Sequence, residues 1–284
     1  MTMNPPPPSG RILLGLDVDG TLLDPSLLDP VGVDAPEVEA VAAAVEAGIE
    51  IVLVTGRQSH SAAAFARALG LEHGWLSCSF GAVTVRLDPG LPDGYEVTRA
   101  VTFDPRPVIA ALAECPDVAI AIEEPGRGYL VDRRWPDGEL VEPQIPLDGR
   151  EVASTPSLMA RSESMPLGDL ATAADTTGLS CAAFRLRDAS WINVTPTGHS
   201  KETGLEALAS SLGIPRENVV AIGDDHSDVP MIRWAGWGVA MGQSPTEVKR
   251  AADEVADGVV DHGAVPIIER LIAGVGEGGQ GPRG

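Results

Sequence analysis

The apolar residues of this chain recur in two alternating patterns. Continuous apolar runs at 12–18 and 49–55 are typical of strands that are buried on both faces. Each run is followed by a stretch with helical character, at 36–48 and 59–70, and both stretches end near a glycine. This order of strand, helix, strand and helix predicts parallel strands joined by right-handed crossovers.

The same alternation returns towards the C-terminus of the chain. The pattern predicts helix 201–213, strand and loop 218–225, helix 227–236, strand 237–241, and helices 245–253 and 263–274. The N-terminal and C-terminal regions together predict an α/β fold with a Rossmann-like parallel-sheet core. The sequence contains no internal repeat that would suggest another architecture.

The pattern changes between about Arg86 and Asp188. This stretch is rich in proline and glycine, and its strand-like pieces are short, at 83–87, 95–101, 117–124 and 182–188. We interpret it as an α+β cap domain inserted into the core. The predicted organisation is a disordered Pro-rich segment at 1–10, a first core segment at 11–86, the cap at 87–188, a second core segment at 189–275, and a disordered Gly-rich tail at 276–284.

The net charge of the chain makes some classes of binding partner unfavourable. The chain has 41 acidic and 20 basic residues, which gives a formal net charge of −21. Because phosphate backbones are held mostly by Lys and Arg, this balance disfavours nucleic acids and anionic membranes as partners. A small phosphorylated substrate remains compatible, because a bound metal ion reverses the sign of the local field.

The cysteines and the apolar segments indicate a compartment. Cys78, Cys115 and Cys181 are far apart and form no CxxC motif, which favours a reducing compartment without a disulfide framework. No apolar run reaches the ~18 residues needed to span a bilayer, and the N-terminus lacks the apolar core of a signal peptide. We therefore expect a soluble, cytoplasmic protein.

Polar residues follow three of the predicted strands where each one ends. These residues are Asp17 and Asp19, then Thr55, Gly56 and Arg57, and finally Asp224 and Asp228. Because the carboxyl ends of parallel strands meet at one edge of the sheet, we expect these side chains to share a crevice. Lys201, at the start of a predicted helix, can supply a positive charge there.

These residue types suit phosphoryl transfer. One carboxylate can attack phosphorus, and a second can protonate the leaving group and then activate water. Mg²⁺ prefers carboxylates, waters and phosphate oxygens as ligands. Lys201 and Thr55 can hold the transferring oxygens, and backbone N–H groups near Gly20 and Gly56 can assist them. A lone acidic turn or acidic loop is the alternative for each motif taken singly.

The motifs DVDGT (17–21), VTGR (54–57), a lysine ahead of a helix and GDDHSD (223–228) occur in this order. The set resembles the four motifs of the haloacid dehalogenase-like (HAD) phosphohydrolases. The spacing is similar to that of the Cof-type, or type IIB, subgroup, which has a large cap between its second and third motifs. Segments 192–208 and 238–256 are also similar to that subgroup, whereas the cap region resembles it only in length and position.

The resemblance implies a role for each matching residue. It makes Asp17 the nucleophile and a Mg²⁺ ligand, and Asp19 the general acid/base with its backbone carbonyl on the metal. Thr55 and Lys201 would bind the phosphoryl group, Asp224 would ligate Mg²⁺, and Asp228 would support the metal site. Gly20, Gly56, Arg57 and Ser227 would lie on the substrate side.

Two positions depart from the family pattern. Ser227 stands where the family usually has Asn, so a phosphate contact is expected to be lost or mediated by water. Phe80 stands where the family often has the Asn of an Asn-Gly-Ala sequence, so that amide is absent.

Several residues keep two interpretations. Arg57 contacts substrate or forms a structural ion pair. For the cap residues Glu123, Glu124, Arg133, Arg134 and Arg161, recognition of sugar hydroxyls or anions competes with a surface salt bridge, which is favoured for each singly. Asp225 is expected to be solvated, and His226 to be an exposed loop residue. A helix cap at Ser227 is an alternative use of the acidic motif.

The resemblance therefore predicts Mg²⁺-dependent hydrolysis of a small phosphate monoester through an aspartyl-phosphate. A sugar phosphate or phosphorylated sugar acid is the expected substrate class. The alternatives are a phosphosugar mutase, which would return the phosphate to the sugar, and a non-catalytic regulator that binds a sugar phosphate.

Overall fold

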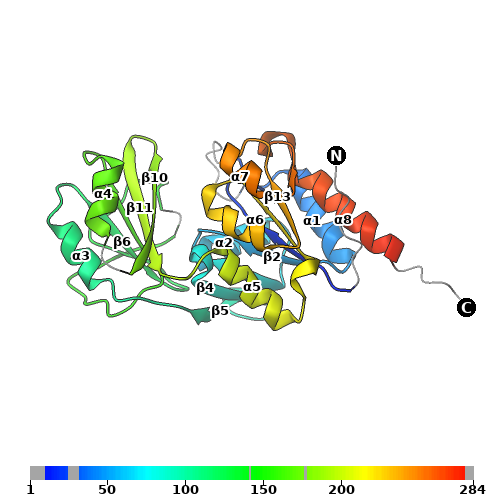
Figure 1. Cartoon of the computed structure of the whole chain (residues 1–284). Helices are drawn as coiled ribbons and strands as arrows, with labels where there is room; N and C mark the ends of the chain where they lie inside the picture. Colours follow the sequence, from blue (N-terminus) through cyan, green and yellow to red (C-terminus); the bar gives the residue numbers. More distant parts are fainter. Residues whose placement is uncertain (1–9, 25–31, 141, 176–177, 279–284) are drawn as a thin grey trace, which may run out of the picture.

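The computed structural model describes residues 10–24, 32–140, 142–175 and 178–278. These residues form two lobes, each built on one sheet (Figure 1). We call the lobe with the eight-stranded sheet the core lobe and the lobe with the six-stranded sheet the cap. The disorder predicted for 1–10 lies outside the described residues except for Gly10.

The sheet of the core lobe has the strand order β14-β13-β12-β1-β2-β3-β4-β5. Its strands are β1 (Leu13–Leu16), β2 (Glu50–Val54), β3 (Gly74–Cys78), β4 (Val83–Leu87), β5 (Tyr95–Ala100), β12 (Val219–Gly223), β13 (Trp237–Ala240) and β14 (Glu254–Val255). Strands β14 to β3 along this order are parallel, and β4 and β5 extend one edge in antiparallel register. The predicted Rossmann-like parallel core is confirmed.

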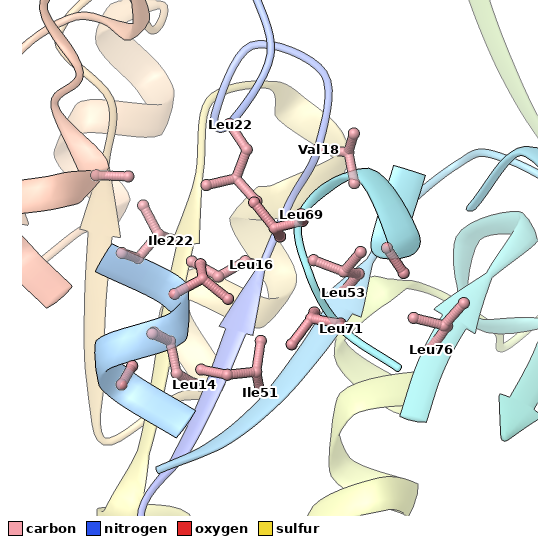
Figure 2. Close-up of a cluster of buried hydrophobic side chains, with 14 of the residues drawn as sticks. Leu14, Leu16, Val18, Leu22, Ile51, Leu53, Leu69, Leu71, Leu76 and Ile222 are labelled. Carbon is pink, nitrogen blue, oxygen red and sulfur yellow. The ribbon is translucent and has the colours of Figure 1, made fainter. Parts of the chain in front are cut away.

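Helices cover both faces of this sheet. They are α1 (Ala35–Glu46), α2 (Ser59–Ala68), α5 (Lys201–Leu212), α6 (Val229–Trp234), α7 (Thr246–Ala251) and α8 (Ala264–Gly278). Leu14, Leu16 and Leu53 pack on the side of α1, α2 and α8, whereas Leu13 and Val52 pack on the side of α5 and α6. Figure 2 shows the first of these clusters. Successive strand residues point to opposite faces, which is why β1 and β2 read as continuous apolar runs.

The cap is an α+β unit. Its sheet has the order β10-β11-β9-β6-β7-β8, and all of its strand pairs are antiparallel except β7 with β8. The strands are β6 (Ala119–Glu124), β7 (Gly128–Val131), β8 (Gln144–Pro146), β9 (Leu158–Ser162), β10 (Leu179–Leu186) and β11 (Ala189–Pro196). Helices α3 (Arg106–Ala113) and α4 (Leu167–Ala174) pack on one face, where they enclose an apolar core that is separate from those of the core lobe.

The two sheets do not divide where the pattern predicted. Strand β5 lies within the predicted cap range of 87–188 but pairs with β4 in the core sheet. Strand β11 lies within the predicted core range of 189–275 but pairs with β9 and β10 in the cap sheet. Strand partners are set by hydrogen bonds between distant segments, so the apolar pattern of one strand does not reveal its sheet.

The predicted disordered tail at 276–284 is wrong at its start. Helix α8 continues to Gly278, and residues 279–284 lie outside the described residues. Helix α8 packs against α1, and helix propagation from a packed segment costs far less than nucleation, so the glycines at its end do not stop it at 274. Within the described residues, no helix has the length and apolar character needed to cross a membrane.

Candidate active site

The carboxyl end of β1 carries Asp17 at the middle of the core sheet. The backbone N–H of Asp17 donates to the carbonyl oxygen of Ile222 on β12 at 3.0 Å. On the other side, Thr55 follows β2, and its N–H donates to the carbonyl of Ser77 at 2.8 Å. Ladder-like hydrogen bonds therefore extend past the strand ends and fix the backbone at which the polar side chains begin.

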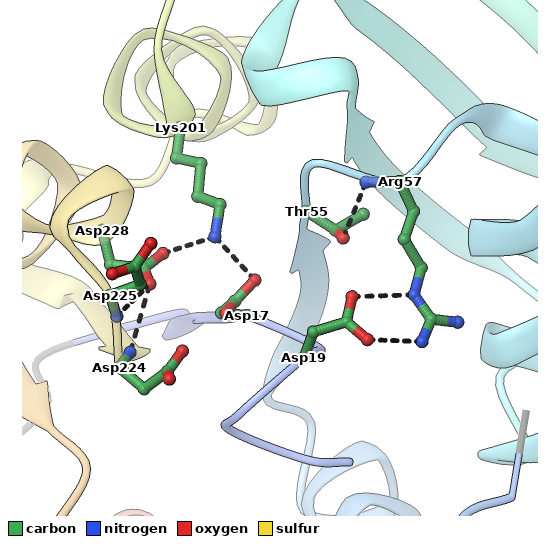
Figure 3. Close-up of polar contacts among 8 residues, drawn as sticks. All are labelled: Asp17, Asp19, Thr55, Arg57, Lys201, Asp224, Asp225 and Asp228. Carbon is green, nitrogen blue, oxygen red and sulfur yellow. Dashed lines mark hydrogen bonds and ion pairs between the residues drawn. The ribbon is translucent and has the colours of Figure 1, made fainter. Parts of the chain in front are cut away.

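Lys201 joins the two acidic motifs. It is the first residue of α5, whose N-cap Ser200 forms a capping box with Thr203. Its Nζ donates to Asp17 Oδ1 at 2.7 Å and to Asp228 Oδ1 at 2.6 Å, and all three side chains are buried (Figure 3). The structure thus brings together the lysine and the acids that the sequence predicts to share a site.

Asp228 shapes the acidic loop after β12. Its Oδ2 accepts hydrogen bonds from the backbone N–H groups of Asp224 at 3.1 Å and Asp225 at 3.0 Å. A Cβ on Gly223 would lie 2.5 Å from Asp228 Cβ, so the loop needs glycine there. Asp225 is exposed and caps the short turn His226–Asp228, so the cap is at Asp225 and not at the alternative position, Ser227.

The buried acids fit a divalent cation. Asp17, Asp224 and Asp228 each offer a carboxylate oxygen within 4.8 Å of the others. Asp224 Oδ1 is buried and has no hydrogen-bond partner among the described residues. Burial, followed by the charge of Asp228, raises the pKa of Asp17 well above its ordinary value, although Lys201 opposes the rise. Burial also raises the pKa of Asp224 to about 6. A hard cation with oxygen ligands would offset this crowding of negative charge.

Burial also acts on Lys201. It lowers the pKa of the ammonium group, but the charges of Asp17 and Asp228 outweigh burial and raise this pKa above its ordinary value. The lysine is therefore a fixed positive charge at the site, and it can hold an anionic oxygen there without exchanging a proton.

Asp19 and Arg57 form the outer side of the site. Arg57 donates from Nε to Asp19 Oδ2 at 2.9 Å and from an Nη to Oδ1 at 2.5 Å. The ion-pair interpretation of Arg57 is thus present, with an Asp19 side chain that is 44% exposed. The Asp19 carboxylate is not in the acidic cluster, and its assignment as a metal ligand through the backbone carbonyl stays a prediction.

Thr55 lies beside this pair. Its hydroxyl oxygen accepts the N–H of Arg57 at 3.0 Å, and the residue is fully buried. Because the oxygen accepts from the backbone, its own proton is directed away from Arg57 and is available to a phosphoryl oxygen. In Figure 3, Asp17 lies between Lys201 and the Thr55–Arg57 loop.

Both predicted glycine positions are tightly packed, and a role of the N–H groups near them in phosphate binding stays a prediction. The N–H of Gly20 donates to the carbonyl of Leu23 at 2.8 Å, so it is not directed at substrate. Glycine is needed at this position because φ is 89° and a Cβ would lie 2.1 Å from Asp224 Oδ2. At Gly56 a Cβ would lie 2.6 Å from the ring of Phe80, so the residue that replaces the family's Asn packs directly on this glycine.

Two further residues belong to the acidic loops or contact them: Ser227 lies in the turn after β12, and Gln243 contacts the loop after β1. Ser227 is half-buried, and no hydrogen bond from its hydroxyl is present among the described residues. The Gln243 amide donates to the carbonyl of Gly20 at 2.5 Å and accepts the N–H of Val259 at 3.0 Å. The residue pattern alone does not single out Gln243 as functional, although it lies within the segment 238–256 that resembles the family.

Most cap candidates form ion pairs. The pairs are Glu124 with Arg127, Arg133 with Asp132, Arg134 with Asp137, and Arg161 with Glu139 and Glu163. His226 is exposed, as expected. Glu123 is the exception, because it is buried and forms no ion pair within the described stretches of the chain, so the surface salt bridge favoured for it is wrong.

Comparison with known proteins places this geometry in a family. The family model described as haloacid dehalogenase-like hydrolase matches residues 14–90 and 180–268, which include all three strand ends and Lys201. Pyridoxal phosphate phosphatase YbhA of Escherichia coli is 29% identical over 92% of this chain and 98% of its own length. The match to Stress response protein YhaX of Bacillus subtilis is 53% identical but spans 64 residues, 22% of either chain.

A solved structure extends the likeness to the cap. The HAD subclass IIB sugar phosphatase BT4131 superposes with a TM-score of 0.70 at 22% identity, over 92% of this chain and 98% of that one. At this identity the likeness concerns the fold, which includes both lobes. The family model, by contrast, matches more than half of the chain and carries the acidic motifs. The chain belongs to the haloacid dehalogenase-like hydrolases.

Proposed function

We propose that this protein is a Mg²⁺-dependent phosphatase that hydrolyses a small phosphate monoester through an aspartyl-phosphate. The observation that carries the proposal is the buried bridge of Lys201 between Asp17 and Asp228, with Asp224 beside it. This arrangement leaves an acidic oxygen of the nucleophile candidate next to a fixed cation and an incomplete set of oxygen ligands. A phosphate group and a divalent ion together would complete it.

The proposed first step is attack by Asp17 on phosphorus. The Asp17 carboxylate forms the new P–O bond while the bond to the leaving alkoxide breaks, and Asp19 donates a proton to that alkoxide. Lys201 and the Thr55 hydroxyl hold the transferring oxygens in line. Asp17, Asp224 and Asp228 would hold Mg²⁺, which when bound supplies positive charge to offset that of the phosphoryl oxygens.

The second proposed step hydrolyses the aspartyl-phosphate and regenerates the free Asp17 carboxylate. Asp19 accepts a proton from water, and the resulting hydroxide attacks phosphorus and releases inorganic phosphate from Asp17. Arg57 orients the Asp19 carboxylate through both of its oxygens, and the exposed position of that side chain allows it to face substrate and water.

The proposed substrate class is a sugar phosphate or a phosphorylated sugar acid. The shared fold with a sugar phosphatase supports this class, and the near full-length relative named as a pyridoxal phosphate phosphatase adds pyridoxal 5′-phosphate to the compounds to test. The test is phosphate release with Mg²⁺ over a panel of sugar phosphates, phosphorylated sugar acids, phosphoglycolate and pyridoxal 5′-phosphate.

The Asp17→Asn variant is the decisive comparison. We expect it to lose at least ~10³-fold in kcat, because the amide cannot form the acyl phosphate, and we expect excess chelator to abolish wild-type turnover. Asp188→Asn, in an exposed turn, is the matched control and retains activity. Phosphate release that survives Asp17→Asn contradicts the covalent mechanism. Isomerised product without free phosphate would instead identify a mutase, and tight binding without turnover a regulator.

A further inference from the structure

The cap and the core lobe meet through polar groups. Hydrogen bonds that cross between them include, among the described residues, those from the N–H of Gly126 to Ser59 Oγ at 3.0 Å, from the Ser61 hydroxyl to the Glu142 carboxylate, and from the Ser79 hydroxyl to Glu123 Oε2 at 2.7 Å. The core lobe thus offers hydroxyls, and the cap offers two buried carboxyl groups. The Glu123 contact is the one that reaches the turn after β3, next to the active site.

Glu123 is buried and has no cationic partner among the described residues. It lies in β6 and is 2% exposed. Its N–H donates to the carbonyl of Ser157 at 2.9 Å, and its own carbonyl accepts from the Thr155 hydroxyl at 2.8 Å. Its Oε1 is buried and has no hydrogen-bond partner among the described residues. A buried carboxyl group in this setting is costly to ionise.

The turn that Glu123 contacts is strained. Ser79, Phe80 and Gly81 have φ values of 51°, 54° and 89°, which is the left-handed region. Two consecutive non-glycine residues in this region are unusual, and such strain persists only where surrounding contacts hold it. The Ser79 hydroxyl bond to Glu123 is one of those contacts.

This turn braces both phosphate-binding elements. The N–H of Ser79 donates to the carbonyl of Arg57 at 2.9 Å, and the N–H of Phe80 donates to the carbonyl of Thr55 at 3.1 Å. On its other side, a Cβ on Gly81 would lie 2.1 Å from the carbonyl oxygen of Ser200, the residue before Lys201. The turn therefore lies between the loop that carries Thr55 and the end of α5 that carries Lys201.

We propose that Glu123 is a positioning residue: its carboxyl group clamps the strained turn 79–81, and through this turn contact with the cap places Thr55 and Lys201 for phosphoryl transfer. The proposal rests on the proposed function for its kinetic consequence, but its structural consequence is independent of turnover. Glu123 acts through Ser79 and not by touching the reacting phosphate.

The buried position of the clamp favours the neutral carboxyl group of Glu123. Burial, opposed by the Ser79 hydrogen bond and then assisted by the charge of Glu142, raises the pKa of Glu123 to about 8. The titratable groups that face it are Glu142, Tyr129 on β7 and Cys78 at the end of β3, and burial raises the pKa of the tyrosine and the cysteine as well. Because these groups are acids, ionisation of Glu123 adds negative charge that no facing cation offsets within the described residues.

The sign of the pH effect follows. With an ordinary pKa of 4.5 when the interface is open, the clamp is fully formed below this value and is lost as the pH rises through about 8. Between these values the closed interface loses up to about tenfold in its equilibrium constant per pH unit.

The experiment compares Glu123→Ala, Glu123→Gln and the control Glu124→Gln with the wild type. Glu124 is the neighbouring glutamate and forms a surface pair with Arg127. At pH 7, hydrogen exchange should show the amides of Ser79 and Phe80 exchanging ~10-fold faster in Glu123→Ala, and at the wild-type rate in Glu123→Gln and Glu124→Gln. Glutamine retains an acceptor for Ser79 and cannot ionise, so it should rescue the clamp.

Kinetics on a small phosphate ester supply the second measurement. Glu123→Ala should lower kcat ~10-fold while KM changes less than about threefold, because the phosphate-holding groups are displaced and substrate contacts are not removed. The ratio of kcat for Glu123→Gln to that of the wild type should rise between pH 7 and pH 9.

Two results would overturn the clamp. One is Glu123→Ala matching Glu124→Gln in both amide exchange and kcat. The other, which remains informative if the alanine variant does not fold, is an alkaline loss of activity in Glu123→Gln identical to that of the wild type. If no variant and no wild-type sample releases phosphate, the proposed function fails, and amide exchange alone then decides the positioning role.

Discussion

The two lobes bury acids in opposite ways. In the core lobe, Asp17 and Asp228 are buried and share the ammonium group of Lys201. At the cap interface, Glu123 and Glu142 are buried against serine hydroxyls, without a cation that faces them within the described residues. In the first arrangement an ammonium group opposes the cost of burying acidic side chains, whereas in the second burial favours the neutral form of Glu123, which serves as a contact.

We expect the largest effect from removal of the lysine that distinguishes the acids of the core lobe from those of the cap interface. Lys201→Met leaves Asp17 and Asp228 buried without their partner, and we expect the free energy of unfolding to fall by about 3–5 kcal/mol in the absence of metal. The kcat for phosphate release should fall at least ~10³-fold. Denaturant titration and phosphate release measure the two effects. Lys249→Met, on α7, is the control, and equal stability of both variants would show that the buried bridge is not a paired-charge site.

The second prediction compares the effect of the same substitution, leucine to alanine, in the two lobes. Leu205 packs under β1 in the core lobe and Leu158 in the apolar core of the cap, and both are fully buried. Leucine to alanine should cost about 2–5 kcal/mol of unfolding free energy at either site. Only Leu205→Ala should also lower kcat on a small ester, because Leu205 contacts Gly15, two residues before Asp17, and lies one turn after Lys201. Equal kcat losses in both variants would mean that the lobes do not separate chemistry from scaffold.

The smallest predicted effect concerns the acidic loop. Ser227→Asn restores the amide that the family usually has, and its longer reach should add one hydrogen bond to a bound phosphate. We expect KM to fall by about threefold or less, with kcat unchanged, in steady-state kinetics on the preferred ester. A higher KM would show that the position is set against the larger side chain.

Much of the core lobe could be predicted from the pattern of residues. Strands β1 and β2 read as buried because both faces of a parallel sheet are covered, and the helix predicted at 201–213 ends at Gly213, which adopts the left-handed conformation that a C-cap requires. The acids and Lys201 were predictable as a group, because parallel strands carry their C-terminal residues to one edge.

Other features could not be predicted. The cap strands are short and pair with strands far away in the chain, so the pattern assigns β5 and β11 to the wrong lobe. The hydrogen bond from the Gly20 N–H to the carbonyl of Leu23 could not be predicted, because it depends on how the loop closes. Glu123 reads in the sequence as an ordinary surface acid, and only its burial against Ser79 distinguishes it.

The sequence by itself determined the alternation of strands and helices, the edge of the sheet at which the acids collect, and the family to which they belong. These features follow from the local periodicity of apolar residues and from the direction of each strand, and both can be recognised from neighbouring residues in the sequence. Only the tertiary structure decided which acids pair with Lys201, which acids lie against serine hydroxyls, and that the turn 79–81 links the cap to Thr55. The physical reason is that burial and the identity of a buried neighbour, which set the charge of an acid, are properties of packed segments and not of any single segment.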